Sequence, residues 1–231
     1  MMPNTYFRFR QFTVHQEKTA MKVCTDACLF GAWISSEINN WKVQRVLDIG
    51  TGTGLLSLMI AQVSDVTIDA VEIDDNAYAQ AVGNFAASPW KERLIVHHCA
   101  IQQYDPGYKY DLIISNPPFY AQSLRSSDSK KNMAMHSSHL EASELFASIK
   151  RLMAPGGGIA LLSPYNRVNA MEKVIRDNQL FVEQKVAVNQ TEKHPPFRCM
   201  YILRNAFSRL EERKITLNDE EFSALLKSYY L

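Results

Sequence analysis

The sequence contains few cysteines, and their spacing argues against a metal site. Only four occur among 231 residues, and no two form the CxxC pair that is typical of structural zinc. Cys24 and Cys28 lie four residues apart, which fits small buried thiols on one face of a helix. We therefore expect no metal ion.

Long apolar segments are also missing. The chain has no run of about 18 apolar residues, the length that a membrane-spanning helix needs, and it does not open with a charged stretch followed by an apolar one. These absences predict a cytoplasmic protein that has no membrane partner and keeps its thiols reduced.

Neither sign of charge dominates, because the chain has 25 basic and 24 acidic side chains. Their distribution is uneven: residues 1–24 and 185–214 are basic, and the centre is correspondingly acidic. Such asymmetry predicts a nucleic-acid footprint, and an ordinary solvated surface is the alternative. The basic side chains of the two segments are Arg8, Arg10, Lys18, Lys22, Lys185, Lys193, Arg198, Arg204, Arg209, Arg213 and Lys214.

The hydrophobic pattern alternates between expected strands and helices, without internal repeats. Strands are expected near 45–50, 66–72, 94–99, 110–115, 159–162, 181–188 and 198–205, and helices near 25–38, 54–63, 75–87, 141–153, 167–178 and from 218 onward. This alternation predicts an α/β fold whose mostly parallel sheet carries helices on both faces. The last two strands follow each other without a helix, which predicts an antiparallel edge strand. Residues 6–16 predict one or two further strands, and Thr25 or Asp26 is expected to cap the first helix.

A glycine-rich turn follows the first central strand. Residues 46–54 read VLDIGTGTG and lead into an apolar helix, so the turn can take positive φ angles and let a ligand approach the backbone. Leu55 stands where a dinucleotide fingerprint has glycine or alanine, and no phosphate-loop lysine follows. Glu72 ends the next strand about twenty residues later, where an acid can accept hydrogen bonds from ribose hydroxyls. The spacing predicts a site for a nucleoside without a pyrophosphate, held by Gly50, Gly52, Gly54 and Glu72.

A rigid tetrapeptide, Asn116-Pro117-Pro118-Phe119, ends the strand expected at 110–115. Prolines cannot donate to a sheet, so the strand stops there, and Asn116 is held near extended geometry. The segment offers the Asn116 amide oxygen, the Pro117 carbonyl oxygen and the Phe119 ring. Two acceptors beside an aromatic face suit a planar group that bears an NH2, although an ordinary strand-ending turn is the alternative. Because the carboxyl ends of parallel strands meet at one edge, we expect this tetrapeptide and the glycine turn to form one site.

Together, the two motifs resemble those of the Rossmann-like S-adenosylmethionine-dependent methyltransferases. Residues 9–16 (FRQFTVHQ) and 22–33 (KVCTDACLFGAW) narrow the resemblance to the bacterial tRNA1(Val) adenine-N6 methyltransferases. The resemblance implies a seven-stranded sheet, S-adenosylmethionine as cofactor, and a tRNA substrate methylated at the adenine of position 37, beside the anticodon. It also implies one monomeric domain over 1–231, whose parts are an amino-terminal extension over the cofactor pocket (1–40), a catalytic core (41–205) and a carboxyl-terminal helix region (206–231).

The likeness assigns roles to further residues. Lys22 and Thr25 would lie over the cofactor pocket, although Ala27 stands where the family has glycine. Asp48 has two open roles: reaching the amino end of the cofactor through water, or capping the turn. Ala100 and Ile101 follow the third strand, where such enzymes often use an acid to contact the adenine. Alanine cannot do this, so recognition would rest on the backbone and on apolar contact.

The expected chemistry centres on the tetrapeptide. An exocyclic amine is a poor nucleophile, and bonds to Asn116 and Pro117 would stabilise the positive charge that develops on it. Phe119 would stack on the unstacked base, and Tyr120 would form a second wall. Three alternatives stay open: a protein glutamine N5-methyltransferase, a ribosomal RNA guanine-N2 methyltransferase, and an RNA-binding module with a decayed pocket.

The polar segment 121–138 is either a lid over the substrate or a plain loop. His136 and His139 are too few for a metal site, so local capping or RNA contact is expected of them.

Overall fold

The computed structural model of the chain describes residues 4–117 and 142–230. Its elements are β1 (Tyr6–Arg8), β2 (Thr13–His15), α1 (Thr25–Ile38), β3 (Arg45–Ile49), α2 (Leu55–Val63), β4 (Thr67–Glu72), α3 (Asp75–Ala86), η1 (Lys91–Arg93), β5 (Leu94–His98), β6 (Tyr110–Ser115), α5 (Ala142–Leu152), β7 (Met153–Pro164), η2 (Tyr165–Arg167), α6 (Val168–Asp177), β8 (Phe181–Asn189), β9 (Pro196–Arg204), β10 (Glu211–Thr216) and α7 (Glu220–Leu226). Most of these bounds lie within two residues of the predicted ones, because the apolar runs of the sequence end at glycines and prolines.

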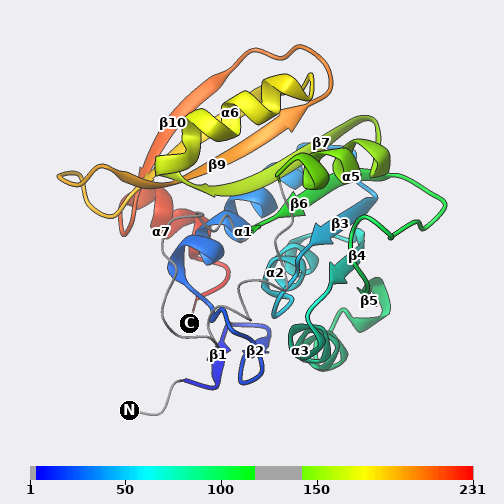
Figure 1. Cartoon of the computed structure of the whole chain (residues 1–231). Helices are drawn as coiled ribbons and strands as arrows, with labels where there is room; N and C mark the ends of the chain where they lie inside the picture. The colour runs from blue at the N-terminus through cyan, green and yellow to red at the C-terminus, as the bar shows by residue number, and fades with distance from the viewer. Residues whose placement is uncertain (1–3, 118–141, 231) are drawn as a thin grey trace, which may run out of the picture.

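One sheet of eight strands organises the molecule, in the order β10-β8-β9-β7-β6-β3-β4-β5. All neighbours pair in parallel except β9, which runs antiparallel to both β7 and β8. The predicted fold class, a mostly parallel α/β sheet with helices on both faces, is confirmed. The small β1–β2 hairpin lies apart from the sheet, near α3 (Figure 1).

Two apolar cores cover the two faces of the sheet, because consecutive strand residues point to opposite sides. In β3, Val46 packs in one core with α1, α2 and α7, while Leu47 packs in the other with α5 and α6. Helices α1, α2 and α7 are grouped together in Figure 1, apart from α5 and α6, which pack on the other face. Every central strand is therefore buried on both sides and fixed in register.

Three details differ from the sequence expectations. The antiparallel strand β9 is not at the edge, since β8 and β10 lie beyond it. The sheet has eight strands rather than the expected seven, and the additional edge strand β10 was not expected because its sequence EERKIT is polar and pairs with β8 through the backbone. Strand β7 begins directly after α5, at Met153, and so includes the glycines at 156–158. Its register against β6 shifts between Tyr110 and Leu112.

The first helix has neither expected cap. Its N-cap residue is Cys24, and no side chain there bonds the free amides. Contacts at its two ends set its direction: Asp26 bonds Arg198 in β9, and Glu37 bonds Gln184 near the start of β8. The amino end of α1 therefore lies at the edge of the sheet where β7 ends, beside the carboxyl ends of the parallel strands.

Among the described helices, none is long and apolar enough to cross a membrane.

Candidate active site

The carboxyl ends of three adjacent strands bring the two sequence motifs together. Ile49, the last residue of β3, pairs with Val71 of β4 on one side and with Ser115 of β6 on the other. The Ser115 hydroxyl donates a 2.8 Å hydrogen bond to the Ile49 carbonyl oxygen. Gly50 and Asn116 each follow one residue later, so the glycine turn and the start of the proline tetrapeptide are neighbours.

The three glycines of the turn all have positive φ angles, 71° at Gly50, 58° at Gly52 and 81° at Gly54. Their surroundings divide them. A Cβ atom on Gly50 or Gly52 would meet no heavy atom within 4 Å, which leaves open space against the backbone. A Cβ on Gly54 would lie 2.4 Å from Phe85 Cε1, so this glycine is needed for packing against α3. Two glycines thus leave room for a ligand, and the third fixes the turn to the helix behind it.

Asp48 anchors the turn from below. Its side chain is 1% exposed, and its Oδ2 atom accepts hydrogen bonds of 2.7 Å from both the Thr51 and Ser57 hydroxyls. Burial raises its pKa to about 6, against the effect of these two bonds, and the nearby charge of Glu72 adds to the rise. Its Oδ1 atom is buried and has no partner among the described residues. Asp48 caps the turn, and one oxygen remains for a further donor.

Glu72 is 8% exposed and oriented by backbone amides. Its Oε2 atom accepts from Gly52 N at 2.8 Å, and Oε1 accepts from Ile73 N at 2.9 Å and Asp74 N at 3.0 Å. A carboxylate oxygen has two lone pairs, so Oε2 keeps capacity for a hydroxyl donor. The acid ties the end of β4 to the glycine turn.

An exposed apolar residue stands directly beside Glu72. Ile73 is 48% exposed at the end of β4, where a flat apolar group could pack on it. Ile101, which the sequence assigned to the adenine, is only 5% exposed and packs in the core below α5 and α6. Ala100 is half-buried in the turn after β5. Sequence reasoning missed Ile73, although an isoleucine after the strand-ending acid was visible.

The proline tetrapeptide is described only in its first half. Asn116 and Pro117 are both half-buried directly after β6. Phe119, Tyr120, the segment 121–138, His136 and His139 lie outside the described residues.

The amino-terminal segment is tied together by backbone contacts. The Lys22 ammonium group donates to the carbonyl oxygens of Gln16 and Thr19, and the buried Gln16 side chain accepts from Val23 N at 2.8 Å. Thr25 is exposed at the amino end of α1. The segment therefore reaches the carboxyl edge, but neither Lys22 nor Thr25 has a hydrogen bond to the glycine turn among the contacts of the described residues.

An ion pair fixes this segment to the sheet. Arg198 Nε lies 2.6 Å from Asp26 Oδ2. Burial opposes ionisation of Asp26, yet hydrogen bonds from the Cys24 thiol and Arg198 hold the pKa of this carboxyl below its usual value.

Asn84 in α3 is a positioning residue that sequence reasoning missed. It is 1% exposed, and its Nδ2 atom donates to Thr53 O at 2.8 Å and to His15 O at 2.9 Å. Its Oδ1 atom accepts from His15 N at 2.9 Å. One side chain thereby joins the β1–β2 hairpin to the glycine turn. The sequence pattern could not have identified this role, because a buried asparagine on a helix can bond many different partners.

Most basic residues of the carboxyl-terminal footprint are neutralised within the fold. Four of the seven cations in 185–214 face carboxylates: Lys185 pairs with Glu172 and Glu212, Arg198 with Asp26, Arg204 with Glu183, and Arg213 with Glu37 and Glu221. The footprint stays a prediction, and these four side chains bring less free charge to it because carboxylates already balance them.

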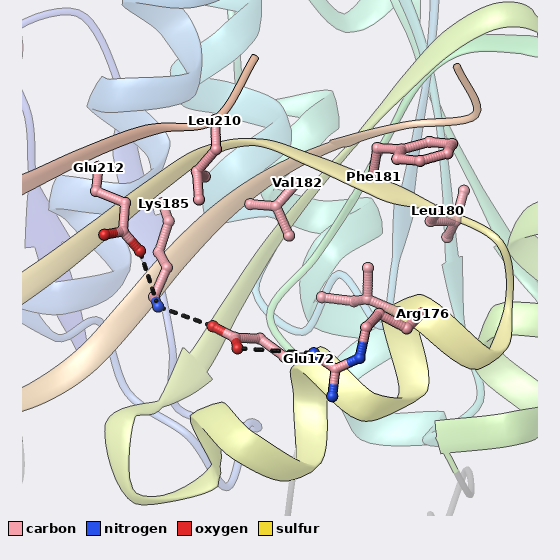
Figure 2. A pocket seen from close by; sticks show the side chains of 9 residues that line it. Glu172, Arg176, Leu180, Phe181, Val182, Lys185, Leu210 and Glu212 are labelled. Atoms are coloured by element: carbon pink, nitrogen blue, oxygen red, sulfur yellow. Dashed lines mark ion pairs between the residues drawn. The ribbon is translucent and has the colours of Figure 1, made fainter. Parts of the chain in front are cut away.

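A pocket of about 300 Å³ lies away from this edge. It is lined by α6, the first half of β8 and the start of β10, and Lys185 bridges Glu172 and Glu212 in it, with Phe181 and Leu210 at its rim (Figure 2). Its side chains come from the opposite end of β8, so it is separate from the composite site. Among residues 4–117 and 142–230, no group of three histidine, cysteine or acidic side chains is placed to hold a metal ion.

Comparison with known proteins agrees with this geometry. The Methyltransferase small domain family matches residues 32–185. A tRNA1(Val) (adenine(37)-N6)-methyltransferase of Parabacteroides distasonis is 39% identical over all of this chain and 99% of its own length. The protein of the same name from Cytophaga hutchinsonii is 48% identical over 76% of this chain and 74% of its own.

Solved structures support the fold at lower identity. The ribosomal protein L11 methylase of Lactobacillus delbrueckii subsp. bulgaricus superposes with a TM-score of 0.57 at 15% identity, over 84% of this chain and 83% of its own. The N-methyltransferase NodS of Bradyrhizobium japonicum, solved with S-adenosyl-L-homocysteine, superposes with a TM-score of 0.53 at 16% identity, over 79% of this chain and 86% of its own. With the full-length relatives and the shared fold, this chain belongs to the tRNA1(Val) (adenine(37)-N6)-methyltransferase family.

Proposed function

We propose that this protein transfers the methyl group of S-adenosylmethionine to N6 of adenine 37 in tRNA1(Val). The observation that carries the proposal is the pairing of Ile49 with Ser115, because it sets a nucleoside-binding turn beside two fixed acceptors for an amine. Relatives that match the whole chain at 39% identity are named for this reaction.

The residues present fit the cofactor. The open space at Gly50 and Gly52 admits a ligand against the backbone, and the partnerless Oδ1 atom of Asp48 suits its ammonium group. Glu72 would accept from the ribose hydroxyls, and Ile73 would pack against the adenine ring. Gly54, Ala100, Asn116, Lys22 and Thr25 would complete the cofactor set, as supports of the turn or as cover over the pocket. Ile101, which is 5% exposed, would support the set only from the core. When bound, S-adenosylmethionine supplies an activated methyl group on a sulfonium centre.

In the methyl transfer itself, the chain would chiefly position and polarise the adenine amine. Asn116 Oδ1 and the Pro117 carbonyl oxygen would accept hydrogen bonds from the adenine amine and so favour a pyramidal nitrogen. As positive charge develops on that nitrogen, the same two oxygens stabilise it. The Phe119 ring would stack on the base after it leaves its own stack. The acidic product ammonium can lose its proton to water, so no dedicated base is required.

The direct test is methylation of purified, unmodified tRNA1(Val), followed by digestion and mass spectrometry of the nucleosides. We expect N6-methyladenosine at position 37, and no product when this adenine is replaced by guanine. Product in a protein substrate would instead assign a glutamine N5-methyltransferase, and N2-methylguanosine in ribosomal RNA would assign the guanine enzyme. Absence of S-adenosylmethionine binding would leave an RNA-binding module.

A monomeric state and a cytoplasmic location belong to the same proposal. The four free cysteines support a reducing compartment. The same proposal divides the chain into an extension over 1–40, a core over 41–205 and a terminal region over 206–231. Hydrogen bonds from Asn84 to His15 and from Arg198 to Asp26 join the extension to the core. Sedimentation analysis would test the monomer.

A further inference from the structure

Methylation of a base in an RNA loop places demands on the protein surface around the base. The adenine must leave its stack to reach Asn116, so the phosphates on either side of it lie against the protein near this residue. Neutralisation of phosphates by lysine and arginine supplies much of the affinity in such complexes. The cations closest to the carboxyl edge are therefore the ones to examine.

The sheet continues past Asn116 on one side. Ser115 pairs with Leu161, so Asn116 is level with Leu162, and β7 extends two residues further to Pro164. Two strand residues span about 7 Å, so the next turn, η2 (Tyr165–Arg167), lies just past the level of Asn116. Pro164 pairs in turn with Arg198 near the start of β9. The connection between β8 and β9, residues 190–195, thus lies at the same edge.

Among the described residues of β7, η2 and the 190–195 loop, two cations have no carboxylate partner. Arg167 is half-buried in η2, and Lys193 is exposed in the 190–195 loop. This contrasts with Lys185, Arg198, Arg204 and Arg213, each of which is paired. On the side of Asn116 that β7 and β9 form, the charge left free among the described residues is therefore that of Arg167 and Lys193.

The 190–195 loop is ordered by its own hydrogen bonds. The Thr191 hydroxyl lies 2.7 Å from His194 Nδ1 and accepts from Lys193 N at 3.3 Å, and the buried Asn189 side chain donates to the His194 carbonyl oxygen. A loop that is already ordered loses little entropy when it binds. Lys193 is thus presented on a stable support.

We propose that η2 and the 190–195 loop form the surface that holds the RNA backbone next to the reacting adenine, with Arg167 and Lys193 each contacting a phosphate. This inference rests on the proposed function and names the part of the enzyme that meets the substrate outside the base pocket. It replaces the broad basic footprint with two cations on one side of the site.

The test compares Arg167→Ala and Lys193→Ala with Arg209→Ala. Arg209 is exposed and precedes β10, at the opposite edge of the sheet, so it is a matched control. The affinity for unmodified tRNA1(Val) is measured at several salt concentrations, and the affinity for S-adenosylmethionine and the melting temperature are measured for each variant.

We expect each of the first two variants to bind tRNA about fivefold to tenfold more weakly and to lower the slope of log Kd against log salt by about 1. Cofactor affinity and melting temperature should stay at wild-type values, as should all properties of Arg209→Ala. Unchanged tRNA affinity in both edge variants, with methylation by the wild type intact, would overturn this surface alone. An equal loss in Arg209→Ala would also overturn it, in favour of diffuse attraction. A wild-type protein that leaves tRNA1(Val) unmethylated would instead overturn the proposed function.

Discussion

The Ser115 hydroxyl and the Ile49 carbonyl oxygen are joined by a hydrogen bond of 2.8 Å across two parallel strands. The bond is fully buried and links the last residue before the glycine turn to the last residue before Asn116. Because both strands are covered on both faces, this junction is a rigid base for the two halves of the site. In the proposed site, the positions of cofactor and amine would thereby be coupled through the backbone.

Replacing Asn116 by alanine should separate catalysis from cofactor binding. The variant loses one of two acceptors for the amine, so we expect the methylation rate to fall by about 10²–10³, by analogy with oxyanion donors. The Kd for S-adenosylmethionine, measured by calorimetry, should stay within about twofold of the wild-type value. Asn169→Ala, an exposed asparagine on α6, is the control and should methylate normally. Intact turnover in Asn116→Ala would remove this residue from the mechanism.

The sequence was sufficient for the central sheet, because long apolar runs bounded by glycine or proline have few other outcomes. Residues 46–49, 68–71 and 112–115 are buried on both faces, and each was expected as a strand. The same logic failed for β10, whose residues Glu211–Lys214 are exposed and carry no apolar pattern. Its strand form depends on pairing with β8, which only the assembled sheet provides.

The site was predictable to the level of motifs but not of contacts. The positions of Gly50, Glu72 and Asn116 at neighbouring strand ends followed from parallel topology alone. That Gly54 serves packing, and that Asn84 holds the hairpin, depends on which side chains meet after folding. The two turns of residues 165–167 and 190–195 lie near Asn116 only because β7 and β9 extend further toward this edge of the sheet than β6 does.

Alanine at two glycines of the same turn should give opposite defects. At Gly54 the new Cβ would lie 2.4 Å from Phe85 Cε1, so we expect a loss of about 3 kcal/mol in the free energy of unfolding. At Gly52 the Cβ meets open space, so only the cost of positive φ remains, about 1 kcal/mol, while cofactor affinity falls. Urea unfolding and calorimetry measure the two quantities. Gly83→Ala, in α3 and in open space, is the control and should be neutral or slightly stabilising. A similar stability for the Gly52 and Gly54 variants would contradict the division of the turn.

Asp48 should make stability depend on pH. Its pKa is raised by burial to about 6 in the folded state, against 3.8 for a free aspartate side chain. The contribution of protonated Asp48 to the free energy of unfolding is fully present below about pH 4 and is lost as the pH rises through 6. At pH 8 the buried charge therefore costs on the order of 3 kcal/mol. Asp48→Asn keeps an acceptor for Thr51 and Ser57, so it should be more stable than the wild type at pH 8 and nearly equal to it at pH 4.

The same variant decides between the two roles of Asp48. An amide places an NH2 group where the partnerless Oδ1 atom stands, so we expect S-adenosylmethionine to bind about tenfold more weakly. Asp65→Asn, at a fully exposed carboxylate, should change neither stability nor affinity. Unchanged cofactor affinity in Asp48→Asn would restrict this residue to capping the turn.

Removing the Asn84 side chain should loosen the amino-terminal hairpin and the glycine turn together. Asn84→Ala loses three hydrogen bonds and leaves the carbonyl oxygens of His15 and Thr53 without their donor, which should cost about 2–4 kcal/mol of unfolding free energy. Limited proteolysis should then cut within residues 4–24 before the sheet, and cofactor affinity should fall because the turn has lost a support. Gln80→Ala, one helical turn earlier, removes a single bond to Lys18 N and should show a smaller change in all three measurements. Equal protease resistance in the wild type and Asn84→Ala would mean that the packing of Phe9 and Phe12, rather than Asn84, holds the hairpin in place.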